Sequence, residues 1–265
     1  MDLIQAVILA FLQGFTEFLP ISSSGHLILV PKLLGWEDQG LAFDVAVHLG
    51  TLAAVLAYFR KDLVPMARDW LGSLSGGRRT REAQLAWWVV WGTVPVVVVG
   101  GLFAGPVEVY LRSPMVIAAT TAGFGVLLWL ADARGARVRD EYSLNWTDAL
   151  LIGLAQAVAL VPGTSRSGIT MTAALLLGLN REAAARFSFL LSIPVILAAG
   201  ALETGALLRE PAPTDWTPLV VGALVSAGVA YATIKAFIAL LGRIGMAPFA
   251  VYRLFLAALL VWIYL

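Results

Sequence analysis

The chain has 265 residues, of which 60% are hydrophobic and 13% charged, and its formal net charge is +1. A soluble domain carries about 25% charged residues, so this composition excludes an ordinary water-soluble globule and indicates an α-helical integral membrane protein. No basic patch with interleaved aromatic residues is present, so no nucleic-acid partner is expected, and the absence of cysteine excludes disulfides, thiolate metal sites and a cysteine nucleophile.

The first half of the chain has two short apolar runs followed by three long ones. A membrane crossing needs about 20 residues, so the short runs, which proline and glycine interrupt, are expected to pair as a re-entrant hairpin lining a cavity. No Lys or Arg precedes Lys32, so the first run lacks the basic region of a cleaved signal peptide and is expected to remain in the protein. The runs in this half are Leu3–Leu19, Ser22–Leu34, Leu41–Phe59, Leu85–Phe103 and Pro114–Leu130.

The second half repeats this order of short and long runs. Aligning Pro20 with Pro162 leaves Gly25 one residue out of register with Gly168. We therefore predict one integral membrane domain over residues 1–265, built from repeats at about 1–130 and about 146–265. The runs in the second half are Asp148–Val161, Ser165–Leu179, Ala183–Leu208, Pro218–Leu241 and Pro248–Leu265.

The charged loops predict how the chain is oriented in the membrane. If each short pair forms a hairpin, each half crosses three times and the second half is inverted relative to the first. The polar loops at 60–82 and 131–147 hold six and three Lys or Arg residues, so both are expected to be cytoplasmic. The loop at 209–217 and both termini are then external. The predicted fold is an all-α polytopic membrane protein with an inverted-topology repeat, six transmembrane helices and two re-entrant helical hairpins, whose tips meet near the midplane.

The first short pair carries an acidic residue inside apolar sequence. Gln13 and Glu17 are four residues apart and share one face of a helix. An ionisable group there costs about 2.5–3.5 kcal/mol on insertion scales, so Glu17 is expected to face a cavity and to have a partner. The simpler alternatives are an interfacial Glu17 solvated by water and a Gln13 that only bonds a neighbouring helix.

Three serines and a histidine follow the break at Pro20. Serines at a helix start cap its free N–H groups, and at least one of Ser22, Ser23 and Ser24 is expected to do so. Ser23 and His26 are three residues apart, so both can address one substrate group, as an activated nucleophile and its base do. Other roles for His26 stay open: it could be the nucleophile, the acid for the leaving group, or a helix–helix contact.

The second short pair contains a similar break, at residues 162–164, followed by a helix start with Ser165, Arg166 and Ser167. Free N–H groups and the positive end of the helix dipole form an anion site at such a start, and the Arg166 fork suits phosphate oxygens. Thr170 lies four residues after Arg166 and is expected to face the same pocket. The alternative for Arg166 is an ion pair with Glu17 that locks the two halves together.

Asp44 and His48 are four residues apart at the start of a long run, where capping and an internal hydrogen bond are favoured over a role in the site.

Two motifs carry a family resemblance. The first is Gln13-Gly-Phe-Thr-Glu17, continuing as Glu-Phe-Leu-Pro-Ile-Ser-Ser-Ser-Gly-His at 17–26, and the second is Pro-Gly-Thr-Ser-Arg-Ser-Gly-Ile-Thr at 162–170. With these motifs in order, the chain resembles, over essentially its whole length, the bacterial undecaprenyl-diphosphate phosphatases linked to bacitracin resistance. Gln13 stands at a motif position that also takes Glu, which leaves one acid, so any divalent metal is expected to rest mainly on Glu17.

The resemblance implies hydrolysis of undecaprenyl diphosphate to undecaprenyl phosphate and phosphate, which recycles the lipid carrier for peptidoglycan. It implies dependence on Mg²⁺ or Ca²⁺, a place in the bacterial inner membrane, and a site open to the periplasmic or outer face. The expected partners are the substrate and membrane lipid, and a homodimer is left open. The active-site residues that the resemblance implies are Glu17, Ser23, His26, Ser165, Arg166 and Thr170. We predict that Glu17, Ser23, His26 and Arg166 are catalytic, and that the substrate is bound by Gln13, Ser22, Ser24, Ser165, Ser167 and Thr170.

Two other functions compete with this interpretation. Inverted repeats with broken helices are also a transporter architecture, so an inverted-repeat transporter or lipid flippase is the first alternative. The second is a type-2 phosphatidic acid phosphatase, whose motifs Ser24-Gly25-His26 and Ser165-Arg166 partly match. That family needs a His six residues after the Arg, where this chain has Thr172.

Overall fold

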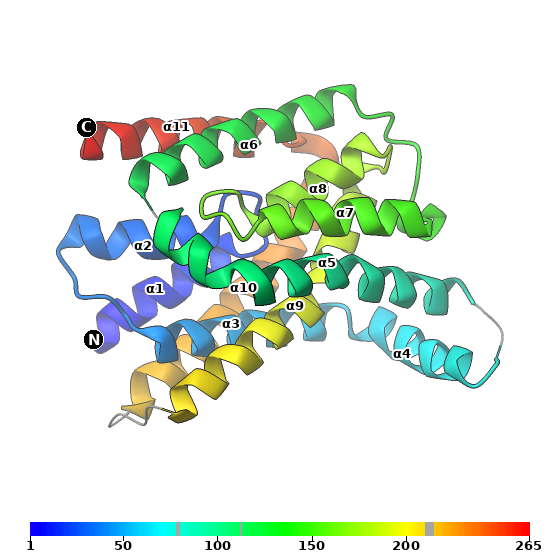
Figure 1. Ribbon diagram of the computed structural model, residues 1–265, viewed down its shortest axis with the longest axis horizontal. Helices are drawn as coiled ribbons and strands as arrows, with labels where there is room; N and C mark the ends of the chain where they lie inside the picture. Colours follow the sequence, from blue (N-terminus) through cyan, green and yellow to red (C-terminus); the bar gives the residue numbers. More distant parts are fainter. Residues whose placement is uncertain (78–79, 112, 210–214) are drawn as a thin grey trace.

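The computed structural model describes residues 1–77, 80–111, 113–209 and 215–265, with the backbone alone for 104–109 and 206–209. Within these residues the regular elements are all helices (Figure 1). They are α1 (Leu3–Thr16), α2 (Ser23–Leu34), α3 (Leu41–Tyr58), α4 (Arg60–Leu74), α5 (Arg81–Tyr110), α6 (Pro114–Arg134), the 3-10 turn η1 (Glu141–Ser143), α7 (Trp146–Val158), α8 (Arg166–Leu176), α9 (Arg181–Arg209), α10 (Trp216–Ile244) and α11 (Ala247–Tyr264).

In the described residues, six helices are long and apolar enough to cross a membrane: α3, α5, α6, α9, α10 and α11. They coincide with the six long runs predicted from the sequence. Large apolar side chains on these helices point outward, and Leu102, Leu224 and Phe255 are each 68% exposed. Water would not favour so much exposed apolar surface, whereas lipid covers it without penalty, so the chain is a multi-pass membrane protein.

The predicted polar loop at 60–82 is wrong over most of its length, because residues Arg60–Leu74 form α4. Apolar residues at helical spacing within this charged stretch give the helix one apolar face, and Met66 is buried in the main core. Trp70 meets Trp87 of α5 edge-on, with ring centroids 5.7 Å apart. Residues 78–79 of this stretch and 210–214 of the predicted external loop lie outside the described residues.

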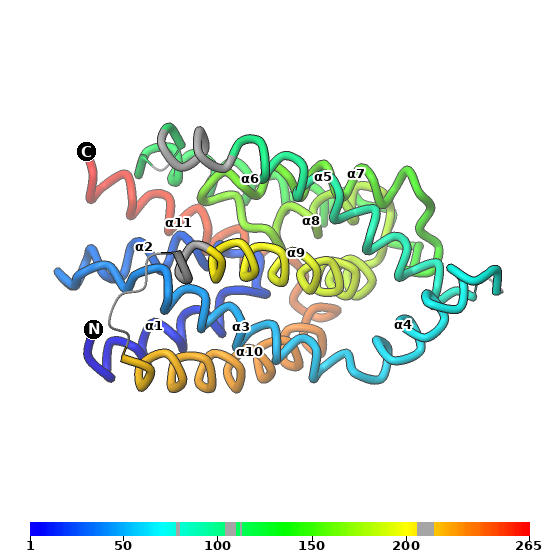
Figure 2. Tube along the Cα trace, turned by 60° about the horizontal axis from the view of Figure 1, so that its bottom comes forward, coloured from blue at the N-terminus to red at the C-terminus, as the bar shows by residue number. Residues whose placement is uncertain are grey.

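The four short helices form two hairpins whose joints meet in the middle of the molecule (Figure 1). The first joint, residues 17–22, connects α1 to α2, and the second, residues 159–165, connects α7 to α8. Each first helix ends before a proline, because proline disfavours helical backbone in the residue that precedes it and cannot donate a hydrogen bond. Below, the first tip means residues 17–24 and the second tip residues 159–167, which are each joint with the first residues of the helix that follows it. Both chain termini lie at one end of the molecule (Figures 1 and 2).

Close helix packing depends on glycine at two equivalent contacts. Helix α1 packs on α10, and α7 packs on α5; Figure 2 also shows α3 running alongside α1 and α10. A Cβ atom on Gly14 would lie 2.6 Å from the Ser226 carbonyl oxygen of α10, and one on Gly153 would lie 2.6 Å from the Gly92 carbonyl oxygen of α5. Small residues at such crossings let membrane helices approach each other closely.

Replacing Gly153 with alanine should lower the free energy of unfolding by about 1–3 kcal/mol, because the added methyl group overpacks the α5–α7 contact. The matched control is Gly228→Ala in α10, where no atom lies within 4 Å of the added carbon. Alanine there should leave the stability unchanged or raise it slightly, since alanine favours helix. Thermal unfolding in detergent measures both variants, and equal melting temperatures would contradict the packing argument.

Candidate active site

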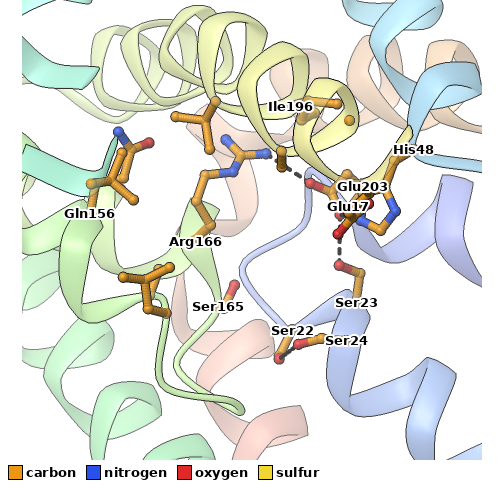
Figure 3. A pocket seen from close by; sticks show the side chains of 16 residues that line it. Glu17, Ser22, Ser23, Ser24, His48, Gln156, Ser165, Arg166, Ile196 and Glu203 are labelled. Atoms are coloured by element: carbon orange, nitrogen blue, oxygen red, sulfur yellow. Dashed lines mark hydrogen bonds and ion pairs between the residues drawn. The ribbon is translucent and has the colours of Figure 1, made fainter. Parts of the chain in front are cut away.

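A cavity of about 210 Å³ lies between the two tips and is closed on other sides by α3, α5 and α9 (Figure 3). Its apolar wall includes Val96 and Ile196. Polar residues from both tips and from the surrounding helices share the remaining wall. They are Glu17, Ser22, Ser23, Ser24, His48, Gln156, Ser165, Arg166 and Glu203.

Glu17 is the residue to which both tips bond. Its Oε2 atom accepts hydrogen bonds from the Ser23 hydroxyl at 2.6 Å and from Gln13 Nε2 at 3.1 Å. Its Oε1 atom accepts from Arg166 Nη2 of the second tip at 3.1 Å, and His48 Nε2 lies 3.9 Å from Oε2 (Figure 3). Glu17 is 9% exposed, so the expectation of a cavity-facing acid with a partner is confirmed, and so is the ion pair with Arg166.

Arg166 is held in a fixed direction at the start of α8. Its Nη1 atom donates to the Ser188 carbonyl oxygen of α9 at 3.0 Å, while Nη2 donates to Glu17. The guanidinium also lies over the Phe18 ring, 5.9 Å from its centroid. A planar fork anchored on both sides is preorganised to bind the oxygens of a tetrahedral anion.

The starts of α2 and α8 share an unusual backbone. Ser22 and Ser165 occupy the N-cap positions with φ of 74° and 70°, in the left-handed region that favours glycine. Such a conformation costs a non-glycine residue about 1–3 kcal/mol and concentrates at functional sites. The Ser165 hydroxyl caps the Gly168 N–H at 3.2 Å, whereas Ser22 makes no side-chain cap bond. Two helix N-termini therefore border one cavity, which favours a bound anion.

His26 bonds away from Ser23. Its Nδ1 atom lies 2.7 Å from the Ser22 carbonyl oxygen, which can only accept, so Nδ1 carries the proton. The Nε2 atom lies within hydrogen-bond distance of the Tyr252 hydroxyl, 2.5 Å away, and the two rings stack with centroids 5.7 Å apart. His26 is not among the residues that line the cavity. The structure thus brings Ser23 to Glu17, and His26 to Tyr252 of α11.

Three other predicted site residues form hydrogen bonds that hold the tips in place, outside the cavity. Thr170 is fully buried and donates to the Arg166 carbonyl oxygen at 2.9 Å, with the Ser188 hydroxyl 2.7 Å away. Ser167 of the second tip donates to the Leu19 carbonyl oxygen of the first at 2.9 Å. Gln13 bonds the Glu17 carboxylate as described above. None of the three lines the cavity.

Sequence reasoning missed several residues around the cavity. His48 makes the expected internal hydrogen bond, from Nδ1 to the Asp44 carbonyl oxygen at 2.7 Å, and it also lines the cavity. The sequence could have pointed to Glu203, because a carboxylate inside a long apolar run is expected to face a polar cavity. Gln156 stands as far from Ser165 along the chain as Gln13 does from Ser22, so the repeat itself points to it. Tyr252 carried no signal, because only the tertiary fold brings α11 to His26.

Comparison with known proteins gives a consistent match. The family described as "Bacitracin resistance protein BacA" matches residues 6–259. The chain is 60% identical to the undecaprenyl-diphosphatase of Nitrosococcus oceani over 264 residues, covering 100% of both chains. It is 58% identical to undecaprenyl-diphosphatase 2 of Stutzerimonas stutzeri, over 98% of this chain and 97% of that one. It is 56% identical to the undecaprenyl-diphosphatase of Thioalkalivibrio sulfidiphilus over the full length of both.

Proposed function

The chain belongs to the bacitracin resistance protein BacA family, and we propose that it is an undecaprenyl-diphosphatase, which releases phosphate from undecaprenyl diphosphate. The product, undecaprenyl phosphate, is the lipid carrier that peptidoglycan synthesis uses again. The observation that carries the proposal is the 2.6 Å hydrogen bond from Ser23 to Glu17, with Arg166 on the other carboxylate oxygen, in a cavity between two helix N-termini. A hydroxyl, a base and an anion-binding fork are the parts that phosphoryl transfer needs.

Ser23 is the proposed nucleophile and Glu17 its base. The Ser23 oxygen attacks the terminal phosphorus, its proton passes to Glu17, and the bond from that phosphorus to the bridging oxygen breaks. Undecaprenyl phosphate leaves with the bonding electrons and takes the proton that Glu17 received, and a phosphoserine remains. Water then attacks the phosphoserine and gives a proton to the deprotonated Glu17. Glu17 passes this proton to the Ser23 oxygen as the bond from that oxygen to phosphorus breaks, which regenerates the enzyme and frees phosphate.

Arg166 and the two helix starts supply the proposed binding of phosphate oxygens. Charge that develops on these oxygens meets donors fixed in advance, which is the strongest form of transition-state stabilisation available without covalent chemistry. Ser22, Ser24 and Ser165 line the same cavity and add hydroxyl donors. A catalytic role for His26 stays a prediction. Its hydrogen bond to the Ser22 carbonyl oxygen supports a second role, in which His26 holds Ser22 in the strained backbone conformation at the start of α2.

The proposal includes a divalent cation, Mg²⁺ or Ca²⁺, with Glu17 as its ligand from the protein. Within the described chain no group of three or more His, Cys, Asp or Glu is spaced to hold a metal. The donor set fits a cation shared with substrate, because Mg²⁺ is commonly held by one or two carboxylates together with phosphate oxygens. Glu17 lines the cavity, and Gln13 Oε1 is buried with no hydrogen-bond partner among the described atoms. When bound, the cation would neutralise charge on the diphosphate.

The proposed membrane arrangement is an inverted repeat with two re-entrant hairpins, in the inner membrane of a bacterium. Reciprocal packing supports the repeat: the first helix of each half packs on the second long helix of the other, α1 on α10 and α7 on α5. The described parts of the basic stretches, residues 60–77, 80–82 and 131–147, lie at the end opposite to both termini, which supports a cytoplasmic side there (Figure 1). His48 of α3 and Glu203 of α9 line the cavity, and the start of α3 and the later part of α9 lie toward the end with the termini, which supports a periplasmic opening (Figure 1).

Release of phosphate from undecaprenyl diphosphate by the purified protein in detergent tests the function. The wild type should release phosphate, and Glu17→Gln should lower kcat by about 10²–10⁴-fold, the usual contribution of a general base. The matched control is Glu37→Gln, an exposed glutamate that should keep the wild-type rate. No release by the wild type would refute the proposal, and lipid movement without release would favour the transporter or flippase instead.

A further inference from the structure

Arg253 is a fully buried arginine for which the site described above gives no role. It lies in α11, is 0% exposed, and does not line the cavity. Among the described residues no carboxylate lies within ion-pair distance of it, whereas the partly buried Arg166, Arg181 and Arg186 each have an acidic partner. An unpaired cation inside a membrane protein is expensive, so its hydrogen bonds must replace what water would provide.

Those hydrogen bonds go to backbone carbonyl groups of both tips. Nη1 donates to the Pro20 carbonyl oxygen of the first tip at 3.3 Å. Nη2 donates to the carbonyl oxygens of Gly163 at 3.0 Å and Thr164 at 2.9 Å, both in the second tip. Nε donates to the Thr121 carbonyl oxygen of α6 at 2.9 Å. These carbonyl groups lie in the non-helical joints, where no helix supplies donors for them, and one guanidinium bonds carbonyl groups from both joints at once.

The neighbouring residues leave room for this guanidinium. A Cβ atom on Gly168 would lie 2.8 Å from Arg253 Nη1, and one on Gly125 would lie 3.0 Å from the Arg253 Cβ. Helix α6 adds a parallel tie, because the Thr120 hydroxyl donates to the Pro162 carbonyl oxygen at 2.6 Å. The second tip is thereby fixed to α6 and α11, and the first tip is fixed to the second.

We propose that Arg253 is a positioning residue for the phosphatase reaction, which sets the register of the two tips against each other. Ser23 and Glu17 belong to the first hairpin and Arg166 to the second, so the distance between nucleophile and phosphate-binding fork depends on that register. A lysine has one ammonium group and cannot reach carbonyl groups on both tips as the planar fork does. The inference rests on the proposed function for its kinetic readout, and a separate structural readout is independent of it.

The kinetic test compares Arg253→Lys with Arg181→Lys. Arg181 bonds both oxygens of Asp132, at 2.6 and 2.9 Å, and neither residue lines the cavity, so it represents a partly buried arginine with a structural role alone. Arg253→Lys should lower kcat by about 10²-fold with little change in KM, as expected for misplacement by about 1 Å. Arg181→Lys should lower the Tm and keep kcat. Wild-type kcat in Arg253→Lys, or equal loss in both variants, would overturn the proposal.

The structural test uses the absence of cysteine from the chain. Lys32→Cys and Leu176→Cys place spin labels at exposed positions near the far ends of α2 and α8. Pulsed EPR should give a narrow distance distribution with Arg253 and a broader one after Arg253→Lys, while Arg181→Lys leaves it narrow. An unchanged distribution in Arg253→Lys would overturn the proposal. Failure of the wild type to release phosphate would refute the proposed function alone.

If Arg253→Lys does not fold, Thr120→Val carries the test. This substitution removes the hydroxyl bond to Pro162 and keeps the shape of the side chain. It loosens the second tip without touching the cavity, so kcat should fall by about tenfold while KM stays near the wild-type value. A wild-type kcat in Thr120→Val would then count against a tip register that limits the reaction.

Discussion

Replacement of Arg166 by lysine is expected to lower kcat for phosphate release by about 10²–10³-fold, the loss that follows removal of one preorganised donor to a developing oxyanion. Lysine keeps the positive charge but presents a point charge where arginine presents a fork. It also gives up either the Ser188 carbonyl or Glu17, which Arg166 bonds simultaneously. Phosphate release under saturating undecaprenyl diphosphate measures the effect.

This substitution separates catalysis from the alternative in which Arg166 only locks the two halves together. A lysine can still form an ion pair with Glu17, so under that alternative the rate would be retained. Arg243→Lys, at an exposed position at the end of α10, is the matched control and should behave as the wild type. A normal kcat in Arg166→Lys would remove Arg166 from the transition state and leave it as a structural cation.

Replacement of Ser23 by alanine is expected to lower kcat by at least about 10³-fold, because the nucleophile and its base act as one unit. Ser24→Ala, in the same cavity but not bonded to Glu17, should lose far less. Rapid acid quench followed by mass spectrometry should find phosphate on Ser23 in the wild type. Phosphohistidine at His26, or full turnover by Ser23→Ala, would show that Ser23 is not the nucleophile.

Much of the fold follows from the order of short and long apolar runs. The lengths of the runs predicted all six long helices, and the prolines at 20 and 162 predicted the two breaks. The same pattern wrongly predicts a loop where α4 lies, because the segment is charged, although Met66 and Trp70 stand at helical spacing. The charge content of a segment indicates whether it lies outside the hydrocarbon core of the membrane, but it does not indicate whether its backbone is helical.

The site was predictable only in part. The inverted repeat predicted that the segments of Glu17 and Arg166 meet, and the ion pair between them, an alternative for Arg166, is present. The spacing of Ser23 and His26 along one helix predicted that these two residues act together. Spacing within one helix cannot reveal a partner on another helix, and the His26 imidazole is hydrogen-bonded to Tyr252 of α11 instead. Arg253 was invisible for the same reason, since its partners are backbone carbonyls of residues far away in the sequence.

In the empty pocket, Glu17 neutralises the positive charge of Arg166, and this ion pair affects which headgroups are able to bind the guanidinium. An incoming headgroup has to compete with an internal carboxylate for the guanidinium, so neutral lipids gain nothing by displacing it. A diphosphate, with more negative charge than one carboxylate, competes well and frees Glu17 to act as a base. The monophosphate product competes less well, so the carboxylate returns to the guanidinium and helps to expel it. The same ion pair thus favours binding of the diphosphate over neutral lipids and favours dissociation of the monophosphate product.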